Sequence, residues 1–201
     1  MDHIRGLRFG PLSRSAVHLC IDMQMLFAQD SPWASRAVAI ASPAVKEICL
    51  RKPEATIFTR FICPDDPGAI SGQWAAFYAS CPELARLDPR LFDIVPELQA
   101  IAPQARTVNR FVFSAFHGSE LLALLRRRAT DTLVFSGVET DICVLATALR
   151  AIDFGYRVIV VEEAVASSNG PGHAAAMTGI FPRFDQQVEI VGVSDLLGRW
   201  K

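Results

Sequence analysis

Three polar residues of this 201-residue chain have types and positions that suit chemistry: Asp22, Arg110 and Cys143. Asp22 ends an apolar run, whose neighbours could keep water from its carboxylate and make it a competent acid or base. Cys143 lies near the start of a predicted helix, where unpaired N–H groups and the positive dipole end favour a thiolate and can hold an oxyanion. The sequence therefore predicts a nucleophilic thiol with an acid/base partner.

Each of these residues also has a simpler interpretation. A capping or turn role is at least as common for an aspartate that ends a strand. A lone buried cysteine is usually a small hydrophobe, and we interpret Cys20, Cys49, Cys63 and Cys81 in that way. Arg110 could pair with an exposed carboxylate.

The elements that must position these residues follow from hydrophobic periodicity. Short β-branched runs alternate with segments of helical period, a pattern typical of βα units in a parallel sheet covered on both faces. We expect strands at residues 16–22, 55–61, 107–110, 132–136, 157–161 and 188–192. We expect helices at residues 34–50, 74–80, 119–128, 141–154 and 173–180.

These elements predict a Rossmann-like, three-layer α/β fold with a mainly parallel six-stranded sheet, in one domain over residues 1–201. Pro43 is expected to break or kink the first long helix, and Thr140 or Asp141 to cap the helix of Cys143. That helix is apolar almost all round, which predicts a central, buried position. In open parallel sheets, ligands bind outside the carboxyl ends of the strands.

The amino-acid composition excludes several classes of function. The chain has 20 basic and 21 acidic residues, a net charge of −1, and 51% hydrophobic residues. This balance excludes a disordered chain and offers no electrostatic attraction to nucleic acid or an anionic membrane. The basic residues are uneven, with 17 Arg against three Lys.

The spacing of the cysteines and the amino-terminal segment indicate in which cellular compartment the protein is expected. Five cysteines without CxxC spacing favour neither a disulfide framework nor a thiolate zinc site. Residues 1–15 contain no apolar signal region, and no uninterrupted apolar run reaches the roughly 20 residues that span a bilayer. We expect a cytoplasmic protein that acts on a small-molecule substrate and has no membrane partner.

Several motifs give the chain a family resemblance. They are LCIDMQMLF at residues 19–27, FTRF at 58–61, FSAF at 113–116, GVETDICVLATALRAIDFGYRVIVVEEAVAS at 137–167, and His173. In this order, over nearly the whole length, they resemble the isochorismatase-like cysteine hydrolases. The GVETDICV string before a helix is the most specific of them.

The resemblance implies a role for each matching residue. Asp22 would receive the thiol proton and pass it to the leaving group, and Cys143 would attack a carbonyl carbon to give a thioester-type intermediate. The backbone N–H groups of Glu139 and Cys143 would form the oxyanion hole, with a cis peptide between Val138 and Glu139.

Arg110 is a departure from the family pattern. Relatives carry lysine four residues before the Ser-Ala-Phe run, where this chain has Arg110. Arginine keeps a fixed charge that can lower the pKa of Cys143 and orient Asp22, but it cannot give up a proton. Activity would fall if the lysine must shuttle a proton or leave room for substrate.

A second departure concerns metal. The nicotinamidase branch has closely spaced Asp and His ligands after the second strand, whereas this chain reads FTRFICPDDPG there, without histidine. Asp65 and Asp66 are interpreted as turn or cap residues and His173 as structural. We therefore expect no metal and no cofactor.

Side chains near the strand ends are candidates for the substrate pocket. Each candidate has core packing as an equal alternative, and Arg60 could bind a substrate carboxylate or pair with Asp65 or Asp66. The candidates are Phe27, Arg60, Phe61, Trp74 and Phe116.

Together these observations predict a metal-independent cysteine hydrolase of a small amide or carbamoyl compound. Two alternatives stay open: an isochorismate-type vinyl-ether hydrolase that needs no nucleophile, and a binding or regulatory member silenced by Arg110. Because relatives are usually dimers or tetramers, we expect a homodimer or homotetramer.

Overall fold

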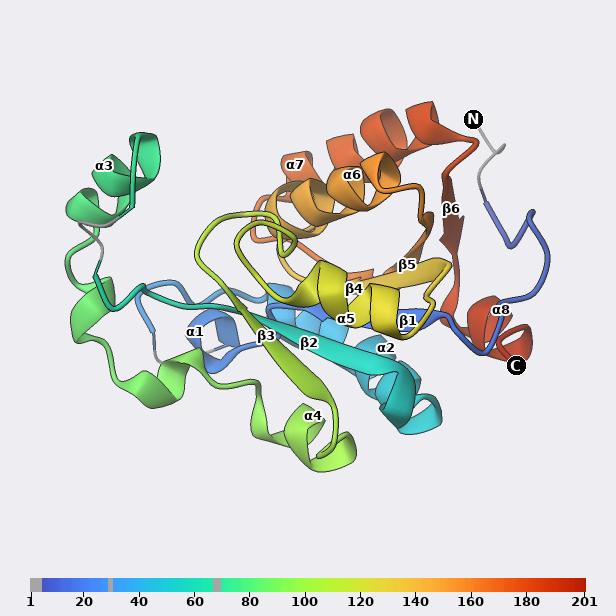
Figure 1. Ribbon diagram of the computed structural model, residues 1–201, viewed down its shortest axis with the longest axis horizontal. Coiled ribbons are helices and arrows are strands. Elements are labelled where there is room, and N and C mark those ends of the chain that lie inside the picture. Colours follow the sequence, from blue (N-terminus) through green and yellow to red (C-terminus); the bar gives the residue numbers. More distant parts are fainter. Residues whose placement is uncertain (1–4, 29–30, 67–69) are drawn as a thin grey trace.

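A computed structural model describes residues 5–28, 31–66 and 70–201, which are arranged around one six-stranded sheet (Figure 1). The strand order is β3-β2-β1-β4-β5-β6, and every neighbouring pair is parallel. The strands are β1 (Val17–Ile21), β2 (Thr56–Phe61), β3 (Arg106–Arg110), β4 (Thr132–Gly137), β5 (Arg157–Val165) and β6 (Val188–Val191). The predicted α/β fold is confirmed, and its sheet is parallel throughout.

Helices cover both faces of this sheet, because each strand sends alternate side chains to opposite sides. The helices are α1 (Met25–Ala28), α2 (Ala37–Arg51), α3 (Gln73–Ser80), α4 (Pro96–Ile101), α5 (Leu121–Arg127), α6 (Leu145–Asp153), α7 (Gly170–Ala175) and α8 (Val193–Gly198). The hydrophobic core on one face includes side chains from α2, α4 and α8. The core on the other face includes α5, α6 and the helical segment 176–184.

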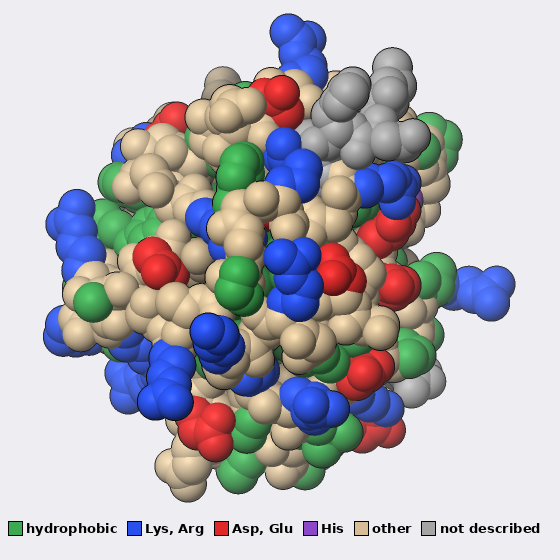
Figure 2. All heavy atoms as spheres, turned by 90° about the vertical axis from the view of Figure 1, so that its right-hand side faces the viewer, with side chains coloured by type: hydrophobic (Ala, Val, Ile, Leu, Met, Phe, Trp, Pro, Cys, Tyr) green, Lys and Arg blue, Asp and Glu red, His purple; other side chains and the backbone are tan. Residues whose placement is uncertain are grey.

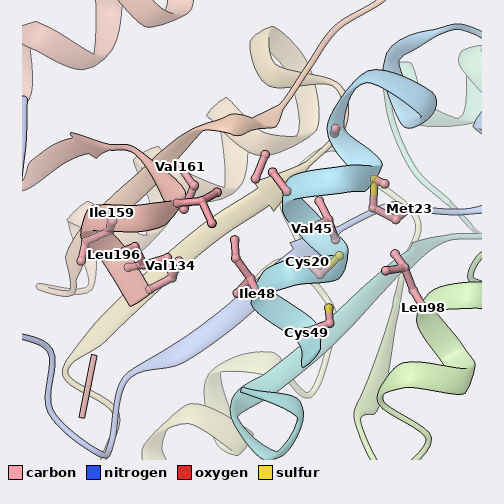
Figure 3. Close-up of a cluster of buried hydrophobic side chains, with 14 of the residues drawn as sticks. Cys20, Met23, Val45, Ile48, Cys49, Leu98, Val134, Ile159, Val161 and Leu196 are labelled. Atoms are coloured by element: carbon pink, nitrogen blue, oxygen red, sulfur yellow. The ribbon is translucent and has the colours of Figure 1, made fainter. Parts of the chain in front are cut away.

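The core beneath α2 contains two of the cysteines. Cys20 of β1 and Cys49 of α2 lie together among aliphatic side chains (Figure 3), and both are fully buried. His18, also fully buried, places Nδ1 3.1 Å from the Thr56 hydroxyl and Nε2 2.7 Å from the Ser136 hydroxyl. The imidazole thus joins β1 to both of its neighbours in the sheet, which satisfies its two nitrogens inside the core.

Two expectations about the helix of Cys143 are wrong, and the expected break at Pro43 is absent. Pro43 lies inside α2, which continues through it. The helix of Cys143 begins as a π-helical turn, Thr140–Val144, without a side-chain cap, because the side chains of Thr140 and Asp141 bond to the segment after β5 instead. The helix is also not buried all round, since Ile142 is 42% exposed.

The order of the strands changes direction between β1 and β4. From this point the chain builds the sheet outward in both directions, which is the topological switch where open α/β sheets bind ligands. Gly137 ends β4 with φ of 107°, and a Cβ there would run into the carbonyl of Ile21. Asp22 follows β1 with φ of 51°, a left-handed conformation that aspartate tolerates better than most residues.

Helix α3 lies beyond the rest of the fold at the end towards which β2 runs (Figure 1). On the face turned to the right in that view, Lys and Arg side chains stand among Asp and Glu side chains (Figure 2). Within residues 5–28, 31–66 and 70–201, no helix is both long and apolar enough to cross a membrane.

Candidate active site

The structure brings Asp22, Arg110 and Cys143 into one buried cluster. Nη2 of Arg110 donates to Oδ2 of Asp22 and also to Sγ of Cys143, at 2.9 Å from the sulfur. Nε of the same guanidinium donates to Oδ1 of Asp22 at 3.2 Å. The exposed fractions of these residues are 0% for Asp22, 1% for Arg110 and 9% for Cys143. Three residues separated by up to 121 positions in sequence therefore share one hydrogen-bonded group.

Asp22 has a further partner that the sequence did not reveal. Oγ1 of Thr59 donates to Oδ1 of Asp22 at 2.7 Å and accepts the Asp22 backbone N–H at 3.2 Å. Thr59 belongs to β2, which pairs directly with β1, and it is the second residue of the FTRF motif. That motif was the available signal, but only the register of β1 and β2 shows that the hydroxyl reaches the carboxylate.

The guanidinium of Arg110 has two further contacts besides Asp22 and Cys143. Nη1 donates to the carbonyl of Val112, and the Phe61 ring lies below the group, 5.2 Å from its carbon. Burial lowers the pKa of Arg110, while the neighbouring Cys143 thiol raises it. A planar, delocalised cation is suited to this site, because it serves three acceptors in fixed directions and stacks on an aromatic face.

The expectation that Cys143 rests as a thiolate is wrong. Burial raises the pKa of the Cys143 thiol above its ordinary value, and this effect outweighs the lowering by Arg110 and by a backbone hydrogen bond from Glu139. Desolvation disfavours the charged form of a thiol. The direction of this shift is opposite to the one expected from the start of a helix.

Asp22 and Cys143 have no direct hydrogen bond to each other in the described chain. The Nη2 group of Arg110 bonds to both. The cation therefore links the thiol to the carboxylate within one hydrogen-bonded group.

The backbone beside the thiol can stabilise negative charge. The Val138–Glu139 peptide bond is cis, where the family resemblance placed one, and the backbone of Glu139 hydrogen-bonds the Cys143 thiol. An N–H group that faces the sulfur also faces the position of an oxyanion formed on attack. The turn of Cys143 is held by Thr147, whose hydroxyl donates to the Cys143 carbonyl at 2.7 Å.

The Phe61 ring, which lies against the guanidinium, belongs to a cluster of aromatic side chains. Trp33 stacks on Phe27 and Phe61, with ring centroids 6.2 and 5.8 Å apart, and Trp74 lies 4.7 Å from Phe113. Phe27, Phe61 and Trp74 were sequence candidates for the pocket, whereas the remaining rings were not. The additional rings of this aromatic cluster are Trp33, Phe77, Tyr78 and Phe113.

The other two pocket candidates lie in different surroundings. Arg60 pairs with Asp93 at 2.9 Å and donates to Asn109 at 3.0 Å, partners that the sequence did not suggest. Phe116 packs against Phe154 and Tyr156, with ring centroids 5.3 and 6.3 Å apart. Because Phe154 follows the carboxyl end of α6 and Cys143 precedes its amino end, Phe116 belongs to the core beneath α6.

The described residues contain no group of three or more His, Cys, Asp or Glu side chains that could hold a metal ion. His173 places Nδ1 3.0 Å from the hydroxyl of Thr140, which agrees with the structural role expected for it.

Known proteins share this fold and these motifs. The family model of the isochorismatase domain matches residues 16–190. The crystal structure of a cysteine hydrolase from Pseudomonas syringae pv. phaseolicola 1448A superposes with a TM-score of 0.77 over 94% of each chain, at 24% identity. The chain belongs to the isochorismatase-like hydrolase family.

Two curated relatives are similar over shorter segments. The isochorismatase family protein PncA of Bacillus subtilis (strain 168) is 43% identical over 76 residues, which make up 38% of this chain and 42% of that protein. The maleamate amidohydrolase of Pseudomonas putida is 35% identical over 92 residues, which make up 45% of this chain and 43% of that protein. This chain therefore matches less than half the length of each of these two relatives.

Proposed function

We propose that this chain is a cysteine hydrolase that cleaves the C–N bond of a small amide or carbamoyl compound. The observation that carries this proposal is the shared guanidinium: one nitrogen of Arg110 bonds both to the Asp22 carboxylate and to the Cys143 sulfur. A thiol and a carboxylate that share one cation are groups that acyl transfer through a thioester can use. The relative named maleamate amidohydrolase supports an amide as the substrate.

The proposed reaction begins when the thiol of Cys143 loses its proton to Asp22 as Arg110 shifts to follow the sulfur. The thiolate attacks the carbonyl carbon, and the carbonyl oxygen takes the negative charge towards the N–H groups of Glu139 and Cys143. The C–N bond breaks, and the nitrogen leaves as ammonia or an amine with the proton held by Asp22. Water then attacks the thioester, which releases the acid and restores the thiol.

Arg110 contributes charge and orientation to this scheme, not a proton. Its fork holds the Asp22 carboxylate in place, and its charge opposes the effect of burial on the Cys143 pKa. Because arginine keeps its proton at all accessible pH values, Asp22 is the group that accepts and returns the proton in the cycle. Every step of this mechanism uses groups of the chain itself and water.

Ammonia release from a panel of small amides and carbamoyl compounds tests the proposal. We expect the wild type to release ammonia from at least one compound and Cys143→Ala to release none. If the wild type is inactive while Arg110→Lys turns over several compounds, this chain is a silenced member of the family. If Cys143→Ala releases ammonia as fast as the wild type, Cys143 is not the nucleophile and the proposed mechanism is wrong.

A further inference from the structure

Three consecutive residues before the nucleophile are bound through their side chains by one segment that follows β5. The hydroxyl of Ser167 lies 2.7 Å from Oε2 of Glu139 and 2.6 Å from Oδ1 of Asp141. Thr140 pairs with His173 at 3.0 Å. We refer to Ser167, Ser168, Asn169 and His173 as the β5 clamp.

Glu139 receives most of these contacts. Oε2 accepts hydrogen bonds from the Ser167 hydroxyl, from the Ser168 backbone N–H at 2.5 Å and from the Ser168 hydroxyl at 2.8 Å. A carboxylate with several donors on one oxygen has little rotational freedom, and it fixes the backbone to which it is attached. The same residue supplies, from its backbone, the hydrogen bond to the Cys143 thiol.

The main chain continues this attachment. The N–H of Thr140 donates to the carbonyl of Ala166 at 3.0 Å, and the N–H of Ala166 donates to the carbonyl of Gly137 at 3.2 Å. The peptide that carries the Glu139 N–H is thus held by backbone bonds on either side and by the clamp through its side chain. An oxyanion hole is effective only when its donors are already oriented before charge develops.

Ser167 is the residue of the clamp that joins two parts of the nucleophile loop. Its single hydroxyl contacts carboxylates of both Glu139 and Asp141, and it is less exposed than Ser168. We propose that Ser167 is a positioning residue that orients the Glu139 N–H toward the oxyanion formed on Cys143. This inference rests on the proposed function, because it takes Cys143 as the nucleophile.

Two reactions of Cys143 separate this role from a general structural one. Acylation by p-nitrophenyl acetate forms an S–C bond, places negative charge on the carbonyl oxygen and expels p-nitrophenolate, so it depends on the oxyanion hole. Alkylation by iodoacetamide forms an S–C bond and expels iodide without any oxyanion. The ratio of the two rate constants therefore measures the orientation of the oxyanion donors and cancels changes in the thiol itself.

We expect Ser167→Ala to slow acylation by about tenfold, less than the loss of a direct oxyanion donor, and to leave alkylation within about twofold. Ser167→Thr, which keeps the hydroxyl, should restore acylation. Ser80→Ala is the matched control, because the Ser80 hydroxyl is exposed on α3 and donates to the carbonyl of Phe77. Cys143→Ala supplies the background rate from Cys63 and Cys81, and mass mapping of the Cys143 peptide identifies the product.

Each outcome decides between the two claims. If the wild type acylates on Cys143 and Ser167→Ala does so equally fast, the positioning role is wrong while the nucleophile stands. If Ser167→Ala slows acylation and alkylation to the same extent, Ser167 supports the fold and not the oxyanion hole, which also overturns the inference. If wild-type Cys143 reacts with neither reagent, the proposed function fails and the inference fails with it.

Discussion

At the scale of single residues, the guanidinium of Arg110 determines the state of the site. It bonds to the Asp22 carboxylate through two nitrogens, to the Cys143 sulfur and to the Val112 carbonyl. A lysine ammonium is a compact charge on a flexible stem and cannot offer donors in the same fixed fork. The arginine therefore supplies a fixed positive charge and bonds both to the thiol and to the carboxylate.

The first prediction concerns the charge of this group. Arg110→Gln removes the cation that lowers the pKa of Cys143, while burial, which raises it, remains. The pKa of the thiol therefore moves further up and less thiolate is present at pH 7, so alkylation by iodoacetamide should slow by about tenfold at that pH. The pH profile of Cys143 alkylation, followed by peptide mapping, measures this change.

A control is needed because Arg110→Gln leaves Asp22 buried without its partner, which costs about 3–5 kcal/mol. The double variant Asp22→Asn/Arg110→Gln removes both charges and should regain stability while its alkylation profile stays displaced to high pH. A profile that coincides with that of the wild type in the double variant would show that Arg110 does not control the thiol.

Thr59 carries the second prediction. Thr59→Val keeps the shape of the side chain but removes the hydroxyl that donates to Asp22 and accepts its backbone N–H. Because both groups are buried, we expect a loss of about 1–3 kcal/mol in the free energy of unfolding, measured in urea. Thr59→Ser keeps the hydroxyl and is the matched control, and equal stability of the two variants would contradict the role of the hydrogen bonds.

At the scale of elements, the close approach of β4 to β1 sets the position of the nucleophile loop. Gly137 lies where a Cβ would collide with the Ile21 carbonyl, and the N–H of Val138 donates to that same carbonyl at 3.0 Å. The loop with Glu139 and Cys143 starts directly from this contact. A glycine at the end of β4 therefore brings the end of β1, with Asp22, next to the start of the loop.

Gly137→Ala is the third prediction. The variant should lose about 3 kcal/mol or more of stability, because it adds both a positive-φ penalty and a collision with backbone. Gly155→Ala is the matched control, since Gly155 also has a positive φ of 84° but nothing within 4 Å of the added Cβ. Thermal unfolding of both variants isolates the contact, and equal losses would show that only the backbone conformation matters.

Sequence patterns were sufficient for the six strands and for part of the site, but they did not predict helices α1, α4 and α8. The apolar composition of β1 and β4 was the signal that predicted these two strands. The structure buries them at every position, as expected for strands covered on both faces of a parallel sheet. Asp22, Arg110 and Cys143 were found because they follow recognisable segments. Thr59 was missed because its role depends on strand register, and Ser167 because its contacts cross from β5 to the nucleophile loop.

The electrostatic state of the thiol could not be predicted from sequence either. The start of a helix and a nearby arginine both suggest a thiolate, and both effects are present, yet burial outweighs them. Burial is a property of the packed molecule, because side chains from several elements remove water from one atom. The packing of Phe116 against Phe154, and not within the aromatic cluster, also depends on the packed molecule and could not be predicted from sequence.

At the scale of the whole molecule, five large apolar side chains of the described residues are exposed, one of them Phe9 at 44%. Ile40 and Leu50 of α2 are 60% and 62% exposed, and beside the site Phe113 and Ile142 are 47% and 42% exposed. Burying such a side chain stabilises by about 1.5–3 kcal/mol, so several together favour association. Ile142 is the immediate neighbour of Cys143, and Phe113 contacts Trp74 of the aromatic cluster.

The fourth prediction is that the chain forms a homodimer or homotetramer, so that light scattering gives two or four times the chain mass of 22.0 kDa. Ile142→Glu places a negative charge next to Cys143, and Leu50→Glu places the same charge on α2. Each variant is the control for the other. The variant that lowers the mass identifies the interface, and association through the Ile142 surface would place a second copy beside Cys143. In that case Cys143 alkylation should change with protein concentration in the wild type but not in Ile142→Glu. A wild-type mass of one chain at tens of micromolar would contradict the prediction and leave the closed, buried cluster of a single chain as the complete site.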